Sequence, residues 1–347
     1  MSPEAEPDQE RLTVAVLAGG RSSEHDVSLS SGEAVREGLQ AAGHEVIWVE
    51  IGRDGAWRCA GERVSMTPAA GLLGADVAFP ALHGPFGEDG TVQGLLETLE
   101  VPFVGAGVAA SAVCLDKVLF KQLMSARGIP QVDHLGVLED RWSLAREEVL
   151  ADVAALGLPA FVKPAHQGSS VGIVKVTSAE QVAGALDGAF AHDRLAIVEA
   201  AARGIEVECS VLGSLRSERA EGAAEAFASP PGQIGLAGDW YDFEAKYSPG
   251  GMDLRVPAPI SRAASERVRE LALEAFVGSG CEGLARVDFF LEEERVLVNE
   301  LNTMPGFTPT SVYAKLLEAS GIGYAELVDR LCRLALERSA AQRAYLY

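Results

Sequence analysis

The sequence predicts an α/β protein whose N-terminal part is an open parallel sheet. Over about the first hundred residues, short apolar runs typical of buried strands alternate with amphipathic stretches typical of helices. The 347-residue chain is 48% hydrophobic and 23% charged, which indicates a globular rather than a disordered protein. Its length suggests two or three domains, with ample material for buried cores.

The N-terminal elements follow from apolar runs and turn residues. A strand at 12–18 ends in Gly19 and Gly20, and an amphipathic helix is expected at about 30–42. The other elements expected here are strands at 45–51 and 76–82 and a helix at 90–99. Because ligands of open parallel sheets collect at the carboxyl ends of strands, segments 19–26 and 83–89 are candidate binding loops.

The rest of the chain mixes strands and helices in a less regular order. A helix at about 109–127 is expected to end at 128–130, where a glycine and a proline stop it. The remaining expected elements are strands at 132–138, 160–163, 172–176, 195–199, 205–212 and 223–229 and helices at 143–156, 178–190, 261–279 and about 324–338. The Gly/Pro-rich stretch 229–251 is long enough to be a mobile lid.

Segment 283–302 predicts a two-stranded hairpin that gathers acidic and amide side chains on one face. If it pivots near Glu294, Asp288 lies opposite Glu300, and Arg286 opposite Asn302. Opposed carboxylates destabilise a sheet unless a cation lies between them, and an all-oxygen set of this kind suits Mg²⁺. The hairpin is therefore a candidate site for a nucleotide phosphate with its metal. A solvated edge hairpin with incidental acids is the alternative.

Charge and composition exclude several classes of function. The chain has 50 acidic residues against 29 Lys and Arg, a formal charge of -21, which opposes binding to nucleic acid or to anionic membranes. An anionic ligand would need a local cluster of cations. Residues 1–11 are polar, and no apolar run approaches the length of a membrane span, so we expect a cytoplasmic protein. The five scattered cysteines are expected to be reduced thiols.

Two lysines lie where a solvated charge is unexpected. Lys163 closes a buried strand, and the backbone N–H groups of the small-residue loop that follows, 165–170, can wrap phosphate oxygens. Lys117 lies in the middle of the 109–127 helix. The loop is therefore a candidate phosphate contact, although a plain turn would also explain its glycines.

The other polar candidates are weak when each is taken alone. Glu24 and His83, in loops at strand ends, would more often be capping or surface residues than catalytic ones. Lys246 and Tyr247 belong to an aromatic-rich part of the predicted lid, which a closing site would need in order to exclude water. Segment 105–110 fits G-x-G-x-x-A, but its preceding strand is too short for a dinucleotide fingerprint, and a tight turn into a helix is preferred.

Several segments occur in the order and with the spacing of one known family. They are GGRSSEHDVS (19–28), HGPFGEDG (83–90), VKP (162–164), GSSVG (168–172), EAKY (244–247), RVD (286–288) and NELNTMPGFT (299–308). Together they resemble the D-alanine:D-alanine ligase family of the ATP-grasp superfamily, and the resemblance runs from about residue 12 to 335.

The resemblance implies a three-domain ATP-grasp fold. Residues 1–107 would form the N-terminal substrate-binding α/β domain with the open parallel sheet. Two α+β domains, 108–199 and 200–347, would clasp ATP between them. The last domain would carry the lid at about 229–251 and the metal-binding hairpin.

The resemblance also implies a role for each matching residue. ATP would be bound by Lys117, Lys163 and Lys246 at its phosphates, by Glu199 and Glu206 at the adenine edge and ribose, by Trp240 against the base, and by the backbone near Ala202. Two Mg²⁺ or Mn²⁺ would be held by Asp288, Glu300 and Asn302. The run Ala200, Ala201 and Ala202 departs from the bulkier or charged residues that many relatives carry around the adenine.

The remaining implied roles concern the amino acid substrates. The first D-alanine would be oriented by Glu24, Ser169 and Tyr247, and His83 would face a substrate carboxylate. The oxyanion would be stabilised by Arg286 and the Gly306 N–H group, and the second D-alanine would be held by Ser311 and Val312.

The implied reaction is the ATP-dependent ligation of two D-alanines for peptidoglycan synthesis. ATP would phosphorylate the carboxylate of the first D-alanine, and the amine of the second would attack the acyl phosphate. Relatives are usually cytoplasmic homodimers. The alternatives are a D-alanine:D-lactate or D-alanine:D-serine ligase, another ATP-grasp carboxylate–amine ligase, or a non-enzymatic nucleotide-binding regulator. The EAKY segment at 244–247 favours the dipeptide enzyme.

Overall fold

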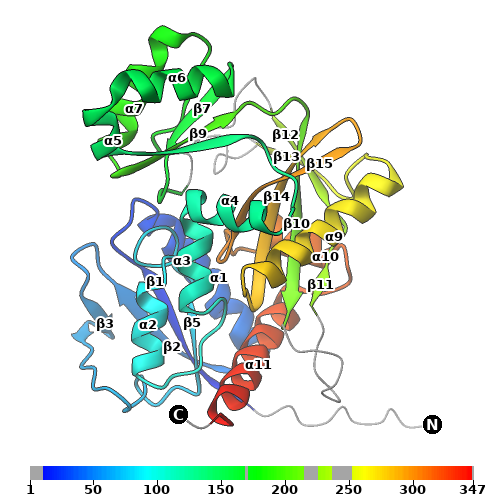
Figure 1. Cartoon of the computed structure of the whole chain (residues 1–347). Coiled ribbons are helices and arrows are strands. Elements are labelled where there is room, and N and C mark those ends of the chain that lie inside the picture. Colours follow the sequence, from blue (N-terminus) through cyan, green and yellow to red (C-terminus); the bar gives the residue numbers. More distant parts are fainter. Residues whose placement is uncertain (1–10, 169–170, 215–225, 237–251, 346–347) are drawn as a thin grey trace.

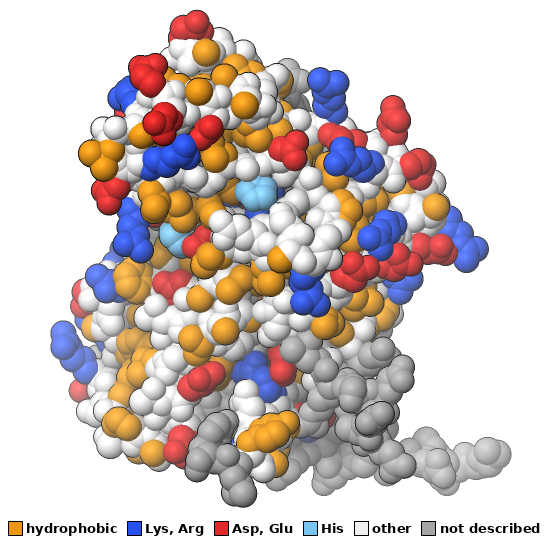
Figure 2. All heavy atoms as spheres, viewed as in Figure 1, with side chains coloured by type: hydrophobic (Ala, Val, Ile, Leu, Met, Phe, Trp, Pro, Cys, Tyr) orange, Lys and Arg blue, Asp and Glu red, His pale blue; other side chains and the backbone are white. Residues whose placement is uncertain are grey.

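The chain is built around three β-sheets that follow one another along the sequence (Figure 1). The structure, a computed structural model, describes residues 11–168, 171–214, 226–236 and 252–345. In these ranges no helix has the length and apolar content needed to cross a membrane. On the face shown in Figure 2, acidic and basic side chains are interspersed and form no continuous basic field.

The first sheet confirms the predicted open parallel arrangement. Its parallel strands are β1 (Thr13–Gly19), β2 (Glu45–Ile51) and β5 (Val77–Pro80), with β1 in the middle. Two short antiparallel strands that were not predicted, β3 (Trp57–Cys59) and β4 (Glu62–Arg63), extend the edge beyond β2.

Helices cover both faces of this sheet. Helix α1 (His25–Ala41) begins earlier than predicted, and α2 (Thr91–Thr98) agrees with its predicted range. The C-terminal helix α11 (Tyr324–Arg343) packs beside α1, and both contribute to the core on one side of the sheet. Helix α2 contributes to the core on the other side. The last helix of the chain therefore ends against the first sheet.

The second sheet is antiparallel, in the order β6-β9-β7-β8. Its strands are β6 (His134–Leu138), β7 (Ala160–Pro164), β8 (Val174–Val176) and β9 (Leu195–Ala200), and its core is shared with α6 (Arg146–Leu156) and α7 (Ala179–Phe190). The prediction of a single helix at 143–156 is wrong. A short helix, α5 (Glu139–Leu144), precedes α6, and Ala145 leaves helical geometry between them with φ -138° and ψ 44°.

The third sheet is also antiparallel and contains the predicted hairpin. Its strands run in the order β13 (Met252–Arg255), β12 (Gly232–Leu236), β10 (Ile205–Gly213), β14 (Gly283–Glu292) and β15 (Arg295–Asn302). The short β11 (Phe227–Ala228) pairs with β10, while residues 223–225 of the strand predicted at 223–229 lie outside the described residues. Helix α9 (Arg262–Gly278) agrees with its prediction, and α10 (Val312–Glu318) was not predicted.

The predicted helix at 109–127 is in fact two helices. Helices α3 (Val108–Leu115) and α4 (Lys117–Ala126) are separated by Asp116, whose backbone is extended with φ -75° and ψ 100°. The Asp116 carboxylate accepts hydrogen bonds from the N–H groups of Val118 and Leu119, which replace the intrahelical bonds lost at the break. Lys117 therefore starts α4 and does not lie in the middle of a helix. Both helices pack into the core of the third sheet.

Candidate active site

The hairpin of β14 and β15 has the predicted cross-strand pairs. Asp288 lies opposite Glu300, and Arg286 lies opposite Asn302. These four side chains therefore share one face, since alternate residues of a strand point the same way.

This pairing depends on a β-bulge that was not predicted. The turn has only two residues, 293–294, and the ladder that leaves it pairs Phe289 with Val298. Continued without interruption, that ladder would place Asn299 opposite Asp288. The register instead shifts by one residue between Asp288 and Phe289, so Asn299 is the extra residue and the next residue faces Asp288. The bulge, and not the turn, brings the carboxylates together.

Arg286 and Asp288 form the centre of this face. The Arg286 guanidinium donates to both oxygens of Asp288, from Nε to Oδ1 and from Nη2 to Oδ2, each at 2.7 Å. Its Nε also lies 2.8 Å from Oε2 of Glu208 on β10, and Asn302 Nδ2 donates to Asp288 Oδ2 at 3.1 Å. Side-chain donors therefore supply the positive partner that opposed carboxylates require.

The same residues fit a divalent cation in their chemistry. Asp288 and Glu300 offer carboxylate oxygens and Asn302 an amide oxygen, which suits Mg²⁺ when waters and phosphates complete its ligand set. Within the described ranges no group of three or more His, Cys, Asp or Glu could hold a metal by itself.

A buried carboxylate between two lysines lies beside the hairpin. Glu199, near the end of β9, contacts Lys163 Nζ through Oε2 and lies 3.0 Å from Lys121 Nζ through Oε1. Burial opposes ionisation of Glu199, but the two lysines outweigh it and lower its pKa to about 2. The Lys121 ammonium also donates to the backbone oxygen of Asn299 at 3.2 Å.

Lys117 joins the same group of charges from the start of α4. Its Nζ donates to the carbonyl of Gln167, in the loop that was predicted to bind phosphate, at 2.7 Å. Burial lowers the pKa of Lys117, and the charges of Glu300, on β15, and Glu88, in the 83–89 loop, oppose that shift. Charges from the first and third sheets thus act on one lysine.

The first part of the phosphate loop is tied down by His166. Its Nδ1 lies 2.7 Å from Asp193 Oδ2, and its Nε2 lies 3.1 Å from Asp116 Oδ2. Hydrogen bonds with Asp116 and Asp193 raise the pKa of His166 to about 9, so the imidazolium is charged at neutral pH. His166 therefore fixes the loop against the residue that precedes Lys117.

His83 connects the first sheet to the loop that follows β15. Its Nδ1 lies 3.0 Å from the Met304 carbonyl, which can only accept, so Nδ1 carries the proton and Nε2 accepts from the Ser31 hydroxyl at 2.9 Å. The same hydroxyl accepts from the N–H group of Phe307 at 3.3 Å. Burial lowers the pKa of His83 and outweighs the opposing charge of Glu24. The imidazole is therefore neutral, with both ring nitrogens already bonded within the protein.

Glu88 and Glu24 form an acidic pair near His83. The Glu88 carboxylate accepts from the N–H groups of Gly84 at 2.6 Å and Met304 at 3.2 Å. Burial and the Glu24 charge raise the pKa of Glu88 to about 8. Glu24 is itself packed against backbone, because a Cβ at Gly84 or Gly168 would lie 2.5 or 2.8 Å from its Oε2. Glu24 thus touches both the 83–89 loop and the phosphate loop.

Ser311 and Gly306 are neighbours at the end of the loop after β15. Ser311 Oγ accepts from the Thr308 N–H group at 3.0 Å, and a Cβ at Gly306 would lie 3.4 Å from that oxygen. Val312, the first residue of α10, is buried in a small apolar cluster.

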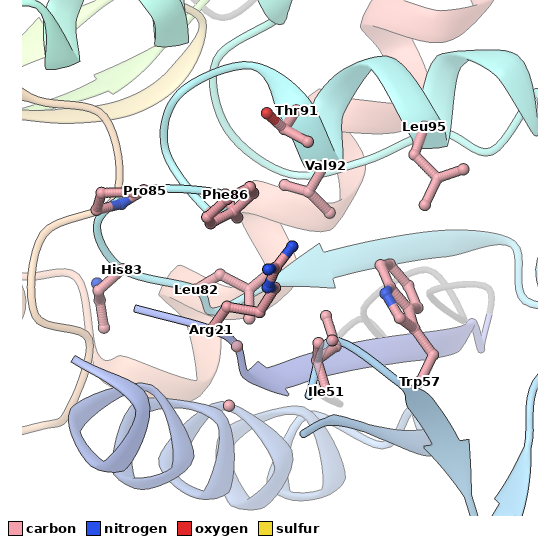
Figure 3. Close-up of a pocket in the computed structure, with 14 residues that line it drawn as sticks. Arg21, Ile51, Trp57, Leu82, His83, Pro85, Phe86, Thr91, Val92 and Leu95 are labelled. Carbon is pink, nitrogen blue, oxygen red and sulfur yellow. The ribbon is translucent and has the colours of Figure 1, made fainter. Parts of the chain in front are cut away.

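A cavity of about 160 Å³ lies behind the His83 loop (Figure 3). Its walls are mostly apolar, and the Arg21 guanidinium stacks on the Phe86 ring at 4.6 Å from the ring centroid. The side chains drawn in Figure 3 come from the first sheet, from its loops and from helix α2. Its lining residues include His83 but no residue of the hairpin and no lysine.

The structure describes most of the predicted site residues. Glu206, on β10, exerts its charge on Lys163, and Ala202 lies in the loop between β9 and β10. The predicted residues that lie outside the described ranges are Ser169, Trp240, Lys246 and Tyr247. Sequence reasoning missed Ser31, Glu88, Lys121 and Glu208. Only two of these carried a signal: Glu88 belongs to the HGPFGEDG segment, and Lys121 lies one helical turn after Lys117.

Two family matches together cover most of the chain. Residues 123–333 match the family described as "D-ala D-ala ligase C-terminus", and residues 13–72 and 58–106 match "D-ala D-ala ligase N-terminus". Among curated relatives, the D-alanine–D-alanine ligase of Deinococcus radiodurans is 45% identical over 93% of this chain and 98% of its own length. The one from Heliobacterium modesticaldum is 43% identical over 94% and 95%.

Two solved structures are also similar. The D-alanine-D-alanine ligase from Coxiella burnetii matches with a TM-score of 0.83 and 33% identity, over 96% of both chains. The VanG D-Ala:D-Ser ligase from Enterococcus faecalis matches with a TM-score of 0.82 and 32% identity, over 94% of this chain and 100% of that one.

Proposed function

The chain belongs to the D-alanine–D-alanine ligase family and is a ligase with an ATP-grasp fold, and we propose that it makes D-alanyl-D-alanine through a D-alanyl phosphate. The observation that carries the proposal is the electrostatic contact among three segments. Lys117 lies within electrostatic range of three carboxyl groups: Glu88 in the loop that follows the first sheet, Glu199 in the second sheet and Glu300 in the third. A carboxylate, an amine and a triphosphate would have to meet at such a point.

Phosphate binding would fall to the lysines at this point. Lys117 and Lys163 would contact the ATP phosphates, with Lys246 from the lid. Glu199, Glu206, Trp240 and the backbone at Ala202 would hold the adenosine part. Two anions must approach each other for the transfer, so converging cations lower the barrier by stabilising the charge that develops.

Asp288, Glu300 and Asn302 would hold two Mg²⁺ or Mn²⁺ on the hairpin. When bound, divalent cations supply charge neutralisation and orientation of phosphate oxygens. Arg286, which now bridges Asp288 and Glu208, would turn toward the oxyanion with the N–H group of Gly306. Its planar guanidinium suits such a contact because it stays charged at all working pH values.

The first D-alanine would bind near Glu24, Ser169 and Tyr247. His83 is neutral and bonded through both nitrogens, so facing a substrate carboxylate would require the imidazole to exchange one of these partners. Ser311 and Val312 would hold the second D-alanine. Closure of the lid at about 229–251 would exclude water, which otherwise hydrolyses an acyl phosphate.

The organisation of the chain is part of the proposal. The substrate-binding domain would span 1–107, and the two ATP-clasping domains would span 108–199 and 200–347. We propose a cytoplasmic homodimer that takes D-alanine and ATP as substrates and contributes to peptidoglycan synthesis, with no nucleic acid or membrane partner.

D-Ala:D-Ser ligation is the second candidate. It is favoured by the similarity to VanG, whose TM-score of 0.82 nearly equals that of the D-alanine-D-alanine ligase structure. The curated relatives at 45% and 43% identity favour D-alanine as acceptor.

A single panel of substrates tests both candidates. We expect Mg²⁺-dependent release of ADP and phosphate with D-alanine, formation of the dipeptide by mass spectrometry, and no turnover with L-alanine. D-serine and D-lactate, each offered with D-alanine, test the choice of acceptor. Equal turnover on L-alanine would contradict the assignment, and phosphate release without dipeptide would indicate a different acceptor.

A further inference from the structure

Lys121 is a buried cation, and none of the roles proposed above involves it. Its side chain is 1% exposed, and its Nζ lies 3.0 Å from Glu199 Oε1 and 3.2 Å from the Asn299 carbonyl oxygen to which it donates. Lys121 belongs to α4, Glu199 to β9 and Asn299 to the bulge of β15. One ammonium group therefore joins the second sheet to the residue that sets the register of the carboxylate face.

Lys163 contacts the other oxygen of the same carboxylate, in a different setting. Its side chain is 11% exposed, and the charges of Glu300 and Glu206 act on it besides that of Glu199. Lys163 thus lies at the edge of the buried cluster, with other anions within electrostatic range. Lys121 is held in the interior between two acceptors.

We propose that Lys121 is a positioning residue that serves as the permanent counter-ion of Glu199 and so leaves Lys163 available to the phosphates of ATP. The inference rests on the proposed function, which assigns Lys163 to those phosphates. A buried carboxylate that loses its only cation is strongly destabilised, whereas one that keeps a second cation is not. A phosphate can therefore draw Lys163 away because Glu199 keeps its ion pair with Lys121.

The contact with Asn299 adds a second consequence. Because the same ammonium bonds to the bulge, Glu199 keeps a fixed place relative to the strand that carries Glu300. Lys121 therefore acts through other residues and needs no contact with the substrates.

The test uses a probe that has phosphates and no adenine. We would replace Lys121 by Met, which keeps the length and apolar stem, and measure binding of Mg²⁺–tripolyphosphate to the full chain by calorimetry. We expect affinity to fall about tenfold or more, because Lys163 becomes the only cation of Glu199. The KM for ATP should rise by a similar factor while kcat changes less. An unchanged tripolyphosphate affinity in a folded Lys121→Met protein would overturn the inference, even if ATP bound more weakly, since Lys121 would then act only on adenine recognition.

Two further variants keep the test decisive. Glu199→Gln removes the carboxylate that pairs directly with Lys163, so tripolyphosphate should bind about threefold more tightly or better than to wild type; unchanged or weaker binding would overturn the inference. This variant decides the matter if Lys121→Met does not fold. Lys175→Met, which removes an exposed lysine of β8, is the matched control and should bind as wild type does.

The wild-type protein separates this inference from the proposed function. If it binds tripolyphosphate but makes no dipeptide from D-alanine, the proposed reaction is wrong and the division of roles between the lysines is still tested. If it does not bind tripolyphosphate, the phosphate role of Lys163 fails and the inference fails with it.

Discussion

Two glutamates, one on each side of the candidate site, are held in opposite charge states: Glu199 is buried and Glu88 is half-buried. Glu199 lies between Lys121 and Lys163, and its pKa is lowered to about 2. Glu88 accepts only from backbone N–H groups among its described contacts and lies near the charge of Glu24, and its pKa is raised to about 8. Burial penalises ionisation of both.

The difference between them is the kind of partner. Full cations outweigh the cost of desolvating a carboxylate, whereas two backbone dipoles beside a second anion do not. Glu199 and its two lysines, on the side of the site where phosphates would bind, stay charged near neutral pH. On the other side, Glu88 keeps its proton near neutral pH. Each of the following experiments tests one side of this contrast.

The largest effect is expected from removing the anion on the lysine side. Glu199→Ala leaves two lysines buried without their carboxylate, which should lower the free energy of unfolding by roughly 3–5 kcal/mol. Urea unfolding followed by circular dichroism measures the loss. Glu148→Ala, which removes an exposed carboxylate from α6, is the control and should leave the midpoint unchanged. A similarly small change for Glu199→Ala would mean that the lysines do not need this anion.

Glu300→Gln tests whether the negative charge on that side is needed for chemistry. The charge of Glu300 acts on both Lys117 and Lys163, and its carboxylate is a proposed metal ligand. We expect turnover to fall about 100-fold to 1,000-fold, a range typical for losing one charge-stabilising group. The thermal midpoint without nucleotide should stay within about a degree, because the exchange is isosteric. Near-normal turnover would show that the carboxylate pair is structural.

The pH dependence of stability tests the Glu88 side. An acid whose folded pKa is raised binds a proton more tightly when folded, so its contribution to stability falls as pH rises from about 4.5 to about 8. In Glu88→Gln this decline should be absent, a difference of about 3 kcal/mol in the change of unfolding free energy between pH 5 and 8. Urea titrations of both proteins across that range measure it. Parallel curves would show that Glu88 ionises normally.

Glu199 should contribute the opposite trend in acid. Its folded pKa is lowered, so its stabilisation is complete above about pH 4.5 and is lost as pH falls toward 2. The same titrations, extended to lower pH with Glu199→Gln, separate the two glutamates.

The smallest effect is expected at Ser31. Its hydroxyl donates to His83 Nε2 and accepts from the Phe307 N–H group, so Ser31→Ala removes two neutral hydrogen bonds. We expect a loss of about 1 kcal/mol in unfolding free energy and a rise in the KM for D-alanine of less than about tenfold. Ser30→Ala, at the exposed neighbouring position, is the control. If Ser31→Ala lowers the stability but leaves the KM for D-alanine unchanged, the role of Ser31 is only structural.

Most strands and helices could be predicted because their apolar patterns are local. The strand at 45–51 agrees with β2 residue for residue, and the one at 205–212 differs from β10 by a single residue. The helix breaks at Asp116 and Ala145 were missed because the apolar periodicity continues through both positions. Asp116 could have been recognised as a helix cap, since a carboxylate directly before an amphipathic run is the usual signal.

Only part of the site could be predicted, because several of its contacts join distant segments and leave no local pattern. The pair Asp288 and Glu300 was placed correctly from a pivot near Glu294, although the bulge at Asn299, on which the observed pairing depends, was not predicted. Lys121 was missed because a helical lysine is normally solvated. Its burial depends on β9 and β15, whose positions no pattern within α4 reveals.

The bulge at Asn299 divides the hairpin into two parts that tolerate insertions and deletions differently. The carboxylate face takes its register from the bulge, so residues added between Glu293 and Glu294 lengthen the tip and leave Asp288 opposite Glu300. The tip is therefore a place to insert a linker, a fluorophore or a small reporter domain near the nucleotide. A residue inserted between Asn299 and Glu300 would instead take the position opposite Asp288 and turn Glu300 to the opposite face. In alignments of relatives, gaps should accordingly gather at the tip and avoid the strand from Asn299 to Asn302.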